Sequence, residues 1–96
     1  MHNEHVNLFK ALSHRSRLSL LELLAQYEEM SVTELTDAMP REGSTISRHL
    51  TQLNLHGLVD VRQDGQNRYY SLNLKEIREK LEDFVQKLES SANLKV

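Results

Sequence analysis

The chain has 96 residues, no cysteine and a formal net charge of −2, with 39% hydrophobic and 27% charged residues. This length predicts one domain over residues 1–96, and the composition is typical of a globular protein rather than a disordered one. The absence of cysteine excludes disulfides, thiolate metal sites and thiol nucleophiles. The slight negative charge argues against a general nucleic-acid coat, although a sequence-specific binder needs only local positive charge.

The sequence has no segment that indicates a membrane or an export pathway. No apolar run approaches the roughly 18 residues that a membrane span needs. The first residues, MHNEHVNLFK, lack the basic region and apolar core of a signal peptide. We therefore expect a cytoplasmic protein with no membrane partner. Nucleophile-elbow, phosphate-loop and His-Glu-x-x-His motifs are also absent, so we expect neither enzyme activity nor a cofactor.

The first two predicted helices form much of the core. Val6, Phe9 and Leu12 have helical spacing, which predicts a helix over residues 3–12. Ser13 is placed to cap a second helix that runs to about Tyr27. Five leucines surround most of this second helix, as expected of a helix that is buried on several sides.

The next two helices and their turn predict a helix-turn-helix. Ser31-Val32-Thr33-Glu34 matches a capping box, which predicts the start of a third helix. Pro40 predicts the end of this helix. Residues 40–43 form the turn, and a fourth helix begins at Gly43 or Ser44. Its inner face carries Ile46, Leu50 and Leu53. Gly57 is placed to end this helix in a left-handed conformation.

The remainder of the chain predicts a β-hairpin and a long last helix. Residues 58–63 and 67–72 alternate in polarity around Asp64-Gly65, which is a strong hairpin signal. An amphipathic helix over about residues 74–90 follows. The fold class is therefore mainly α with a β-hairpin wing, in the order α-α-α-α-β-β-α of a winged helix-turn-helix.

Candidate DNA contacts lie on the fourth helix and on the hairpin. Short hydroxyl and basic side chains in the first turns of a recognition helix suit base edges and phosphates. On the helix these are Ser44, Thr45, Ser47, Arg48, His49 and Gln52. On the wing they are Arg62, Asn67 and Arg68. His49 has an alternative role, in which it packs or bonds inside the helix pair.

The last helix indicates self-association. Its apolar stripe has nothing left to cover in so small a domain, so we expect it to pair with a second copy together with the first helix. The predicted homodimer interface comprises Val6, Phe9, Leu74, Ile77, Leu81, Phe84 and Leu88.

Nearly the whole chain, from about Phe9 to Leu88, resembles the ArsR/SmtB family of bacterial winged-helix repressors. The most specific segments are Ser47-Arg48-His49-Leu50, Gly57-Leu58-Val59 and the hairpin through Tyr70-Ser71-Leu72. The resemblance implies a homodimer that binds double-stranded operator DNA and is released by an inducing signal. It also implies that Ser44, Thr45, Ser47 and His49 contact DNA from the helix, and Arg68 from the wing.

The metal sites of many relatives are not matched. Thiolate sensors carry Cys-Val-Cys where this chain has Ser31-Val32-Thr33, and hydroxyls are poor ligands for soft metals. The last-helix positions of zinc-type sensors fall on about Leu74, Glu76, Lys87 and Ser90, of which only Glu76 is a ligand. We therefore expect a repressor with no metal site. Two alternatives stay open: a metal-responsive repressor that uses His2 and His5, and a winged helix that serves protein–protein interaction.

Overall fold

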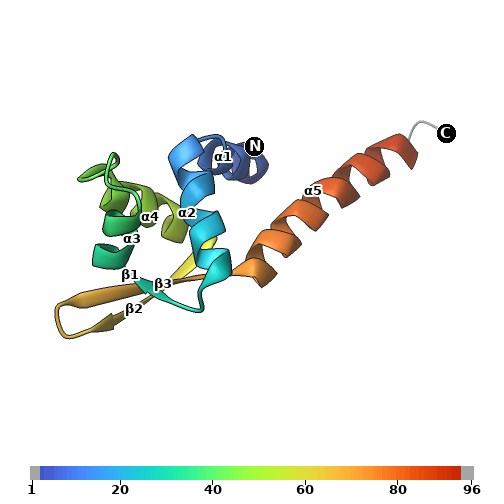
Figure 1. Ribbon diagram of the computed structural model, residues 1–96. Helices are drawn as coiled ribbons and strands as arrows, with labels where there is room; N and C mark the ends of the chain where they lie inside the picture. The colour runs from blue at the N-terminus through green and yellow to red at the C-terminus, as the bar shows by residue number, and fades with distance from the viewer. Residues whose placement is uncertain (1–2, 94–96) are drawn as a thin grey trace.

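The computed structural model describes residues 3–93, which form a helical body with a hairpin at one end and a long helix at the other (Figure 1). The elements in chain order are α1 (Asn3–Leu12), α2 (Arg15–Gln26), β1 (Met30–Ser31), α3 (Val32–Ala38), α4 (Thr45–Leu55), β2 (Val59–Asp64), β3 (Asn67–Leu72) and α5 (Leu74–Asn93). The predicted winged helix-turn-helix is thereby confirmed. Among the helices of residues 3–93, none has both the length and the apolar character that a membrane span requires.

Local signals account for most of the element ends. The Ser31 hydroxyl accepts from the Glu34 amide at 3.1 Å, and the Glu34 carboxylate accepts from the Ser31 amide at 2.8 Å. This reciprocal pair is the predicted capping box of α3. Gly57 follows α4 with a φ of +74°, which is the predicted left-handed conformation. Residues that carry a side chain rarely adopt this backbone conformation.

The expected Ser13 cap is wrong. His14 is the N-cap residue of α2 and its side chain makes no capping bond. The Ser13 hydroxyl instead donates to the Lys10 carbonyl at 2.8 Å, so it completes the end of α1. A serine between two helices satisfies whichever backbone group lies nearer, and here that group belongs to the preceding helix.

The hairpin is part of a three-stranded antiparallel sheet with the order β1-β3-β2. The short strand β1 was not predicted, and it pairs Met30 with Tyr70 and Ser31 with Tyr69. In the hairpin, Gly65 and Gln66 connect β2 to β3, and Gly65 has a φ of +64°. A positive φ at the first of two loop residues fits a type II′ turn, which matches the twist of the strands.

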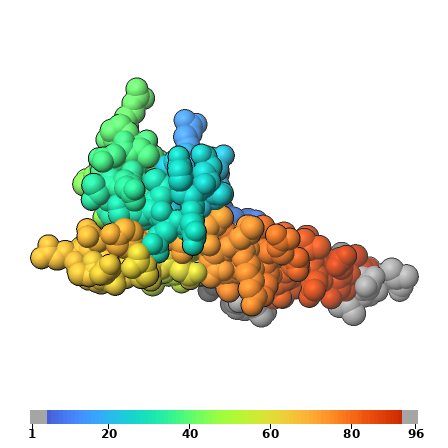
Figure 2. Space-filling model, turned by 60° about the horizontal axis from the view of Figure 1, so that its bottom comes forward, coloured from blue at the N-terminus to red at the C-terminus, as the bar shows by residue number. Residues whose placement is uncertain are grey.

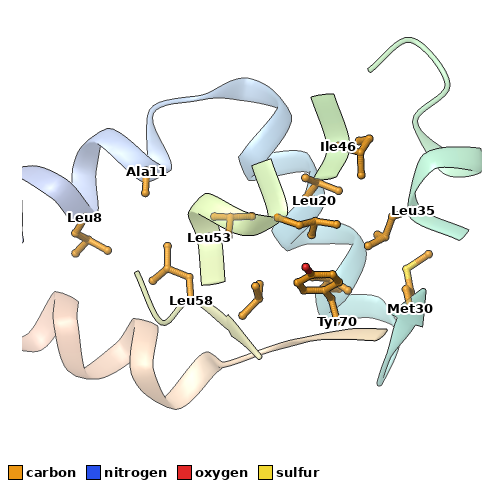
Figure 3. Packing of buried hydrophobic residues seen from close by; sticks show 12 residues of the cluster. Leu8, Ala11, Leu20, Met30, Leu35, Ile46, Leu53, Leu58 and Tyr70 are labelled. Atoms are coloured by element: carbon orange, nitrogen blue, oxygen red, sulfur yellow. The ribbon is translucent and has the colours of Figure 1, made fainter. Parts of the chain in front are cut away.

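The core lies between the helices and the inner face of the sheet (Figure 3). It contains Leu8, Ala11, Leu20, Leu24, Met30, Leu35, Ile46, Leu50, Leu53, Leu58, Val59 and Tyr70. Each fully buried leucine or isoleucine stabilises the fold by about 1.5–3 kcal/mol relative to an exposed one. Because α4 contributes three of these side chains, its orientation is fixed by the core.

The helix α5 projects from the body as an arm (Figure 2), and the molecule measures 55 × 24 × 24 Å. The expectation that α5 covers nothing in its own chain is wrong. Ile77 packs against the core, and the ring of Phe84 meets the ring of Phe9 edge-on at 5.0 Å. The first turns of α5 therefore complete the body, while its later turns extend beyond it.

Candidate nucleic-acid interface

The helix α4 has one buried side and one exposed polar side. Ile46, Leu50 and Leu53 are fully buried and hold the helix against the core. The exposed residues Ser44, Ser47, Arg48 and Thr51 follow the three- and four-residue spacing of a single helix face. This face carries short hydroxyl side chains and one arginine, so a phosphate backbone or a base edge can approach the helix closely.

The hydroxyl groups on this face are not equivalent. The Thr45 hydroxyl donates to the Glu42 carbonyl at 2.7 Å, and the Thr51 hydroxyl donates to the Ser47 carbonyl at 2.9 Å. Within residues 3–93, no side-chain hydrogen bond uses the hydroxyl of Ser44 or Ser47. These two serines can therefore both donate to and accept from a ligand, whereas Thr45 retains only its acceptor lone pairs.

His49 lies on the buried side of α4, so the structure supports the packing alternative for this residue. Its exposed fraction is 8%, and its Nδ1 accepts a hydrogen bond from Arg17 Nε at 3.2 Å. The His14 ring lies 5.0 Å away, centroid to centroid. Burial lowers the pKa of His49, and the nearby charge of Arg17 lowers this pKa further. An Nδ1 that accepts must be unprotonated, so the ring is neutral in this arrangement.

The strand register places the two wing arginines on opposite faces of the hairpin. Arg68 pairs with Gln63 and shares a face with the buried Tyr70, which is the face toward the helices. Arg62 pairs with Tyr69 and lies on the outer face. The two side chains are therefore separated, although the sequence places both beside the same turn.

A hollow of about 300 Å³ lies between the wing and the helix-turn-helix. It is lined by Ser31, Val32, Thr33, Ser47, Gln66, Asn67 and Arg68. Three of the predicted contact residues, Ser47, Asn67 and Arg68, thus come together from two elements. The remaining predicted helix residue, Gln52, is half-buried farther along α4.

Arg62 is held by neighbours on the outer face of the sheet. Its Nη2 and Nε donate to the two carboxylate oxygens of Glu29 at 2.7 and 3.1 Å. The guanidinium lies 4.5 Å from the centre of the Tyr69 ring, and its Nη1 lies 3.8 Å from Asp64 Oδ2. The hydrogen bond to Arg62 lowers the pKa of Glu29, and the same bond raises the pKa of Arg62.

The helices α1 and α5 expose several apolar side chains. Val6, Leu74, Val85 and Leu88 are each about half exposed, and Leu81 is 38% exposed. Among the predicted interface residues, Ile77 and Phe84 are partly covered within the chain. Several exposed apolar side chains on two helices differ from the single scattered leucines of an ordinary protein surface.

The candidate metal residues do not converge in the described part of the chain. His2 lies outside the described residues. His5 Nε2 is bonded to Asp83 Oδ2 at 2.9 Å, and its ring packs on Phe84 at 5.4 Å. Glu76 lies 3.6 Å from Lys80. Within residues 3–93, no group of three histidine or acidic side chains is arranged to hold a metal ion.

Sequence reasoning missed Glu29, Arg17 and Thr51. A sequence signal was present for the burial of His49, because residues 46, 49, 50 and 53 share one helical face. Thr51 continues the spacing of Ser44, Ser47 and Arg48, so the same rule would have found it. Glu29 and Arg62 are 33 residues apart, and no local pattern joins them.

Comparison with known proteins places this architecture in a family. The helix-turn-helix domain family matches residues 12–62. The transcriptional activator HlyU of Vibrio cholerae is 35% identical over 77 residues, which cover 80% of this chain and 70% of the relative. The arsenical resistance operon repressor of Escherichia coli is 35% identical over 68 residues, 71% of this chain and 58% of the relative.

A solved structure extends the match through the whole fold. It is the homodimeric winged helix-turn-helix domain of a possible ArsR-family regulator from Mycobacterium bovis, determined by NMR. Its TM-score is 0.70 at 30% identity, and the match covers 92% of this chain and 80% of that one. The chain belongs to the ArsR/SmtB family. It is a winged-helix transcriptional regulator, and it spans 58–70% of the length of the two curated relatives.

Proposed function

We propose that this ArsR/SmtB-family protein is a homodimeric repressor that binds operator DNA. The observation that carries the proposal is the convergence of Ser47 on α4 with Asn67 and Arg68 on the wing around one hollow. A helix in the major groove and a wing beside it would contact one continuous stretch of duplex from these two elements. The relatives named above include both an activator and a repressor. Repression requires only that the protein occupies the promoter.

The proposed roles of the contact residues follow from their exposure. Ser44, Ser47 and Arg48 are exposed on α4 and are assigned to bases and phosphates. Thr45 and Gln52 are half-buried and contribute at the edges of the same face. Asn67 and Arg68 act from the wing, where an arginine gains from the negative potential of a narrow minor groove. His49 supports α4 from inside.

The exposed apolar face of α1 and α5 supports the homodimer. The M. bovis structure is described as homodimeric, and it matches 92% of this chain. In this chain, Leu81, Val85 and Leu88 of α5 are exposed and do not belong to the core, so a second copy can reach them without disturbing it. A dimer would also present two wings and two copies of α4, as a two-fold symmetric operator requires.

The DNA surface is tested by the salt dependence of binding. Arg68→Ala should weaken binding to every duplex and reduce the slope of log K against log salt by about one. Thr45→Ala should leave this slope unchanged and relax the preference for the operator. Fluorescence anisotropy with the chain's own upstream DNA and with an unrelated duplex measures both effects.

Two control variants make this experiment specific. Arg78→Ala removes the same charge from the exposed surface of α5, far from the wing, and should retain the wild-type slope. Thr45→Ser keeps the hydroxyl that donates to Glu42 and should retain the operator preference. Equal behaviour of Arg68→Ala and Arg78→Ala would contradict the proposed surface. Such a result would favour a protein partner for this winged helix.

A further inference from the structure

Three side chains from separate segments meet on the outer face of the sheet. Arg62 on β2 donates two hydrogen bonds to Glu29, which precedes β1, and its guanidinium lies over the Tyr69 ring of β3. The donor–acceptor distances are 2.7 and 3.1 Å, and the guanidinium is 4.5 Å from the ring centre. Two parallel N–H···O bonds fix the orientation of an arginine more firmly than a single contact does.

The register explains how Arg62 reaches so far. The strand order is β1-β3-β2, with Ser31 opposite Tyr69 and Tyr69 opposite Arg62. Glu29 precedes Ser31 by two residues, which is the spacing of side chains on one face of a strand. The side chain of Arg62 therefore crosses the central strand, with Tyr69 beneath it, and ends at the segment that enters β1.

This contact joins the wing to the start of the helix-turn-helix. Ser31 is the last residue of β1 and also the N-cap of α3, which leads through one turn to α4. The outer strand β2 has no backbone pairing with β1. The contact from Arg62 to Glu29 thus ties the outer strand of the wing directly to the segment that starts α3.

We propose that Glu29, Arg62 and Tyr69 form a strap that sets the angle of the wing relative to α4. In this assignment, which rests on the proposed DNA-binding function, Arg62 is a positioning residue and Arg68 is the wing's DNA contact. Glu29 neutralises the Arg62 guanidinium, so Arg62 adds no net attraction for phosphate. Arg62 and Arg68 lie on opposite faces of the hairpin, and none of the three strap residues lines the hollow that Arg68 lines. An isolated surface ion pair contributes little, but this one is bidentate and stacked on a ring.

The strap and a phosphate contact predict opposite results for two substitutions. Arg62→Lys keeps the charge but cannot bond two oxygens in parallel or stack as a planar group. If the strap operates, Arg62→Lys and Glu29→Gln both weaken operator binding, by about fivefold each. If Arg62 contacts phosphate, Arg62→Lys binds almost as wild type does, and Glu29→Gln binds more tightly because a competing carboxylate is gone.

The experiment measures operator and unrelated-duplex binding over a range of salt concentrations. Glu28→Gln is the matched control for lost negative charge, because Glu28 is exposed and makes no ion pair within residues 3–93. We expect Arg62→Lys, Arg62→Gln and Glu29→Gln to lose operator preference with an unchanged salt slope. The double variant Glu29→Gln/Arg62→Gln should lose no more than either single variant. A slope reduced by about one in Arg62→Gln would overturn the strap.

A second readout separates the strap from the proposed function. Backbone hydrogen exchange reports the hairpin amides without DNA, and circular dichroism checks that each variant is folded. The strap predicts faster exchange in β2 and β3 for Glu29→Gln than for Glu28→Gln, with α2 and α4 unchanged. If the wild type shows no operator preference, the proposed function fails, and the exchange data still decide the strap. Equal hairpin exchange rates in Glu29→Gln and Glu28→Gln would overturn the strap.

Discussion

At the scale of one residue, His49 stabilises α4 from its buried side. It is buried on α4, accepts from Arg17 on α2 and lies beside His14 at the start of the same helix. The other charged groups that affect it are Glu42 in the turn and Arg48 on its own helix. Protonation would turn an accepting nitrogen into a donor that faces a guanidinium. A neutral His49 is therefore part of the packed state.

The lowered pKa of His49 predicts that acid destabilises the protein. In the unfolded chain a histidine titrates near about pH 6.5. Because the folded pKa lies below that value, the unfolded state binds more protons in the interval between them. The stabilisation is complete above about pH 6.5 and is lost as the pH falls through the folded pKa.

The contribution of His49 is isolated by substitution. His49→Gln retains an acceptor for Arg17 but does not titrate. We expect its free energy of unfolding to fall less than that of wild type between about pH 7.5 and pH 5.5. Urea unfolding at the two pH values measures this, with His56→Gln as the control at a half-buried histidine. Equal losses in His49→Gln and wild type would show that His49 does not carry the effect.

At the scale of elements, Gly57 fixes the connection between α4 and the wing. Its φ of +74° is unfavourable for any residue with a Cβ atom. A Cβ at this position would also lie 3.2 Å from Glu76 Cγ on α5. Gly57→Ala should therefore lower the free energy of unfolding by about 1–2 kcal/mol.

The control for this prediction is the exposed glycine of the hairpin. Gly65 has a φ of +64°, but a Cβ there would meet no atom within 4 Å. Gly65→Ala should thus carry only the backbone cost and destabilise less than Gly57→Ala. Urea unfolding of both variants measures the difference. A Gly57→Ala variant as stable as wild type would show that α5 and the α4 end adjust freely.

The elements that the sequence predicted well are those with local chemical signals. The capping box, Pro40, Gly57 and the Asp64-Gly65 hairpin each depend on residues a few positions apart. The strand β1 was missed because two residues are too short to show alternation. The Ser13 cap was misassigned because the same hydroxyl can serve either helix.

The site was predictable only in part, for the same physical reason. Helical spacing indicated the exposed face of α4, and the turn indicated the wing. The separation of Arg62 from Arg68 depends on strand register, which the sequence did not fix. The bond from Arg62 to Glu29 depends on the β1 pairing that was missed.

At the scale of the whole molecule, the proposed DNA surface and the projecting end of α5 lie at opposite ends of a 55 Å particle (Figure 1). The hairpin and α4 are at one end, and the projecting turns of α5 are at the other. Pairing through the arm would therefore leave both DNA surfaces of a dimer free. This separation also places any site on the projecting turns of α5 far from the proposed contact residues.

We expect zinc, cadmium and arsenite to leave the protein bound to DNA at stoichiometric concentrations. A sensor needs several ligands about 2.0–2.3 Å from the metal, and the chain has no thiolate. His5, one of the two N-terminal candidates, is already bonded to Asp83. Titration of the complex on labelled operator measures release. Release by one equivalent of zinc that His5→Ala abolishes would establish an N-terminal metal site instead.

The central claim, a dimer that binds operator DNA, is tested most directly by footprinting on the chain's own upstream region. The wild type should protect two symmetric half-sites whose centres lie about 10 base pairs, or a multiple of this, apart. Leu81→Asp places a charge on the exposed arm, where the monomer tolerates it because Leu81 is 38% exposed. This variant should sediment as a monomer and lose the paired protection at the same concentration. Wild-type protection of a single site, or equal footprints for wild type and Leu81→Asp, would contradict the account.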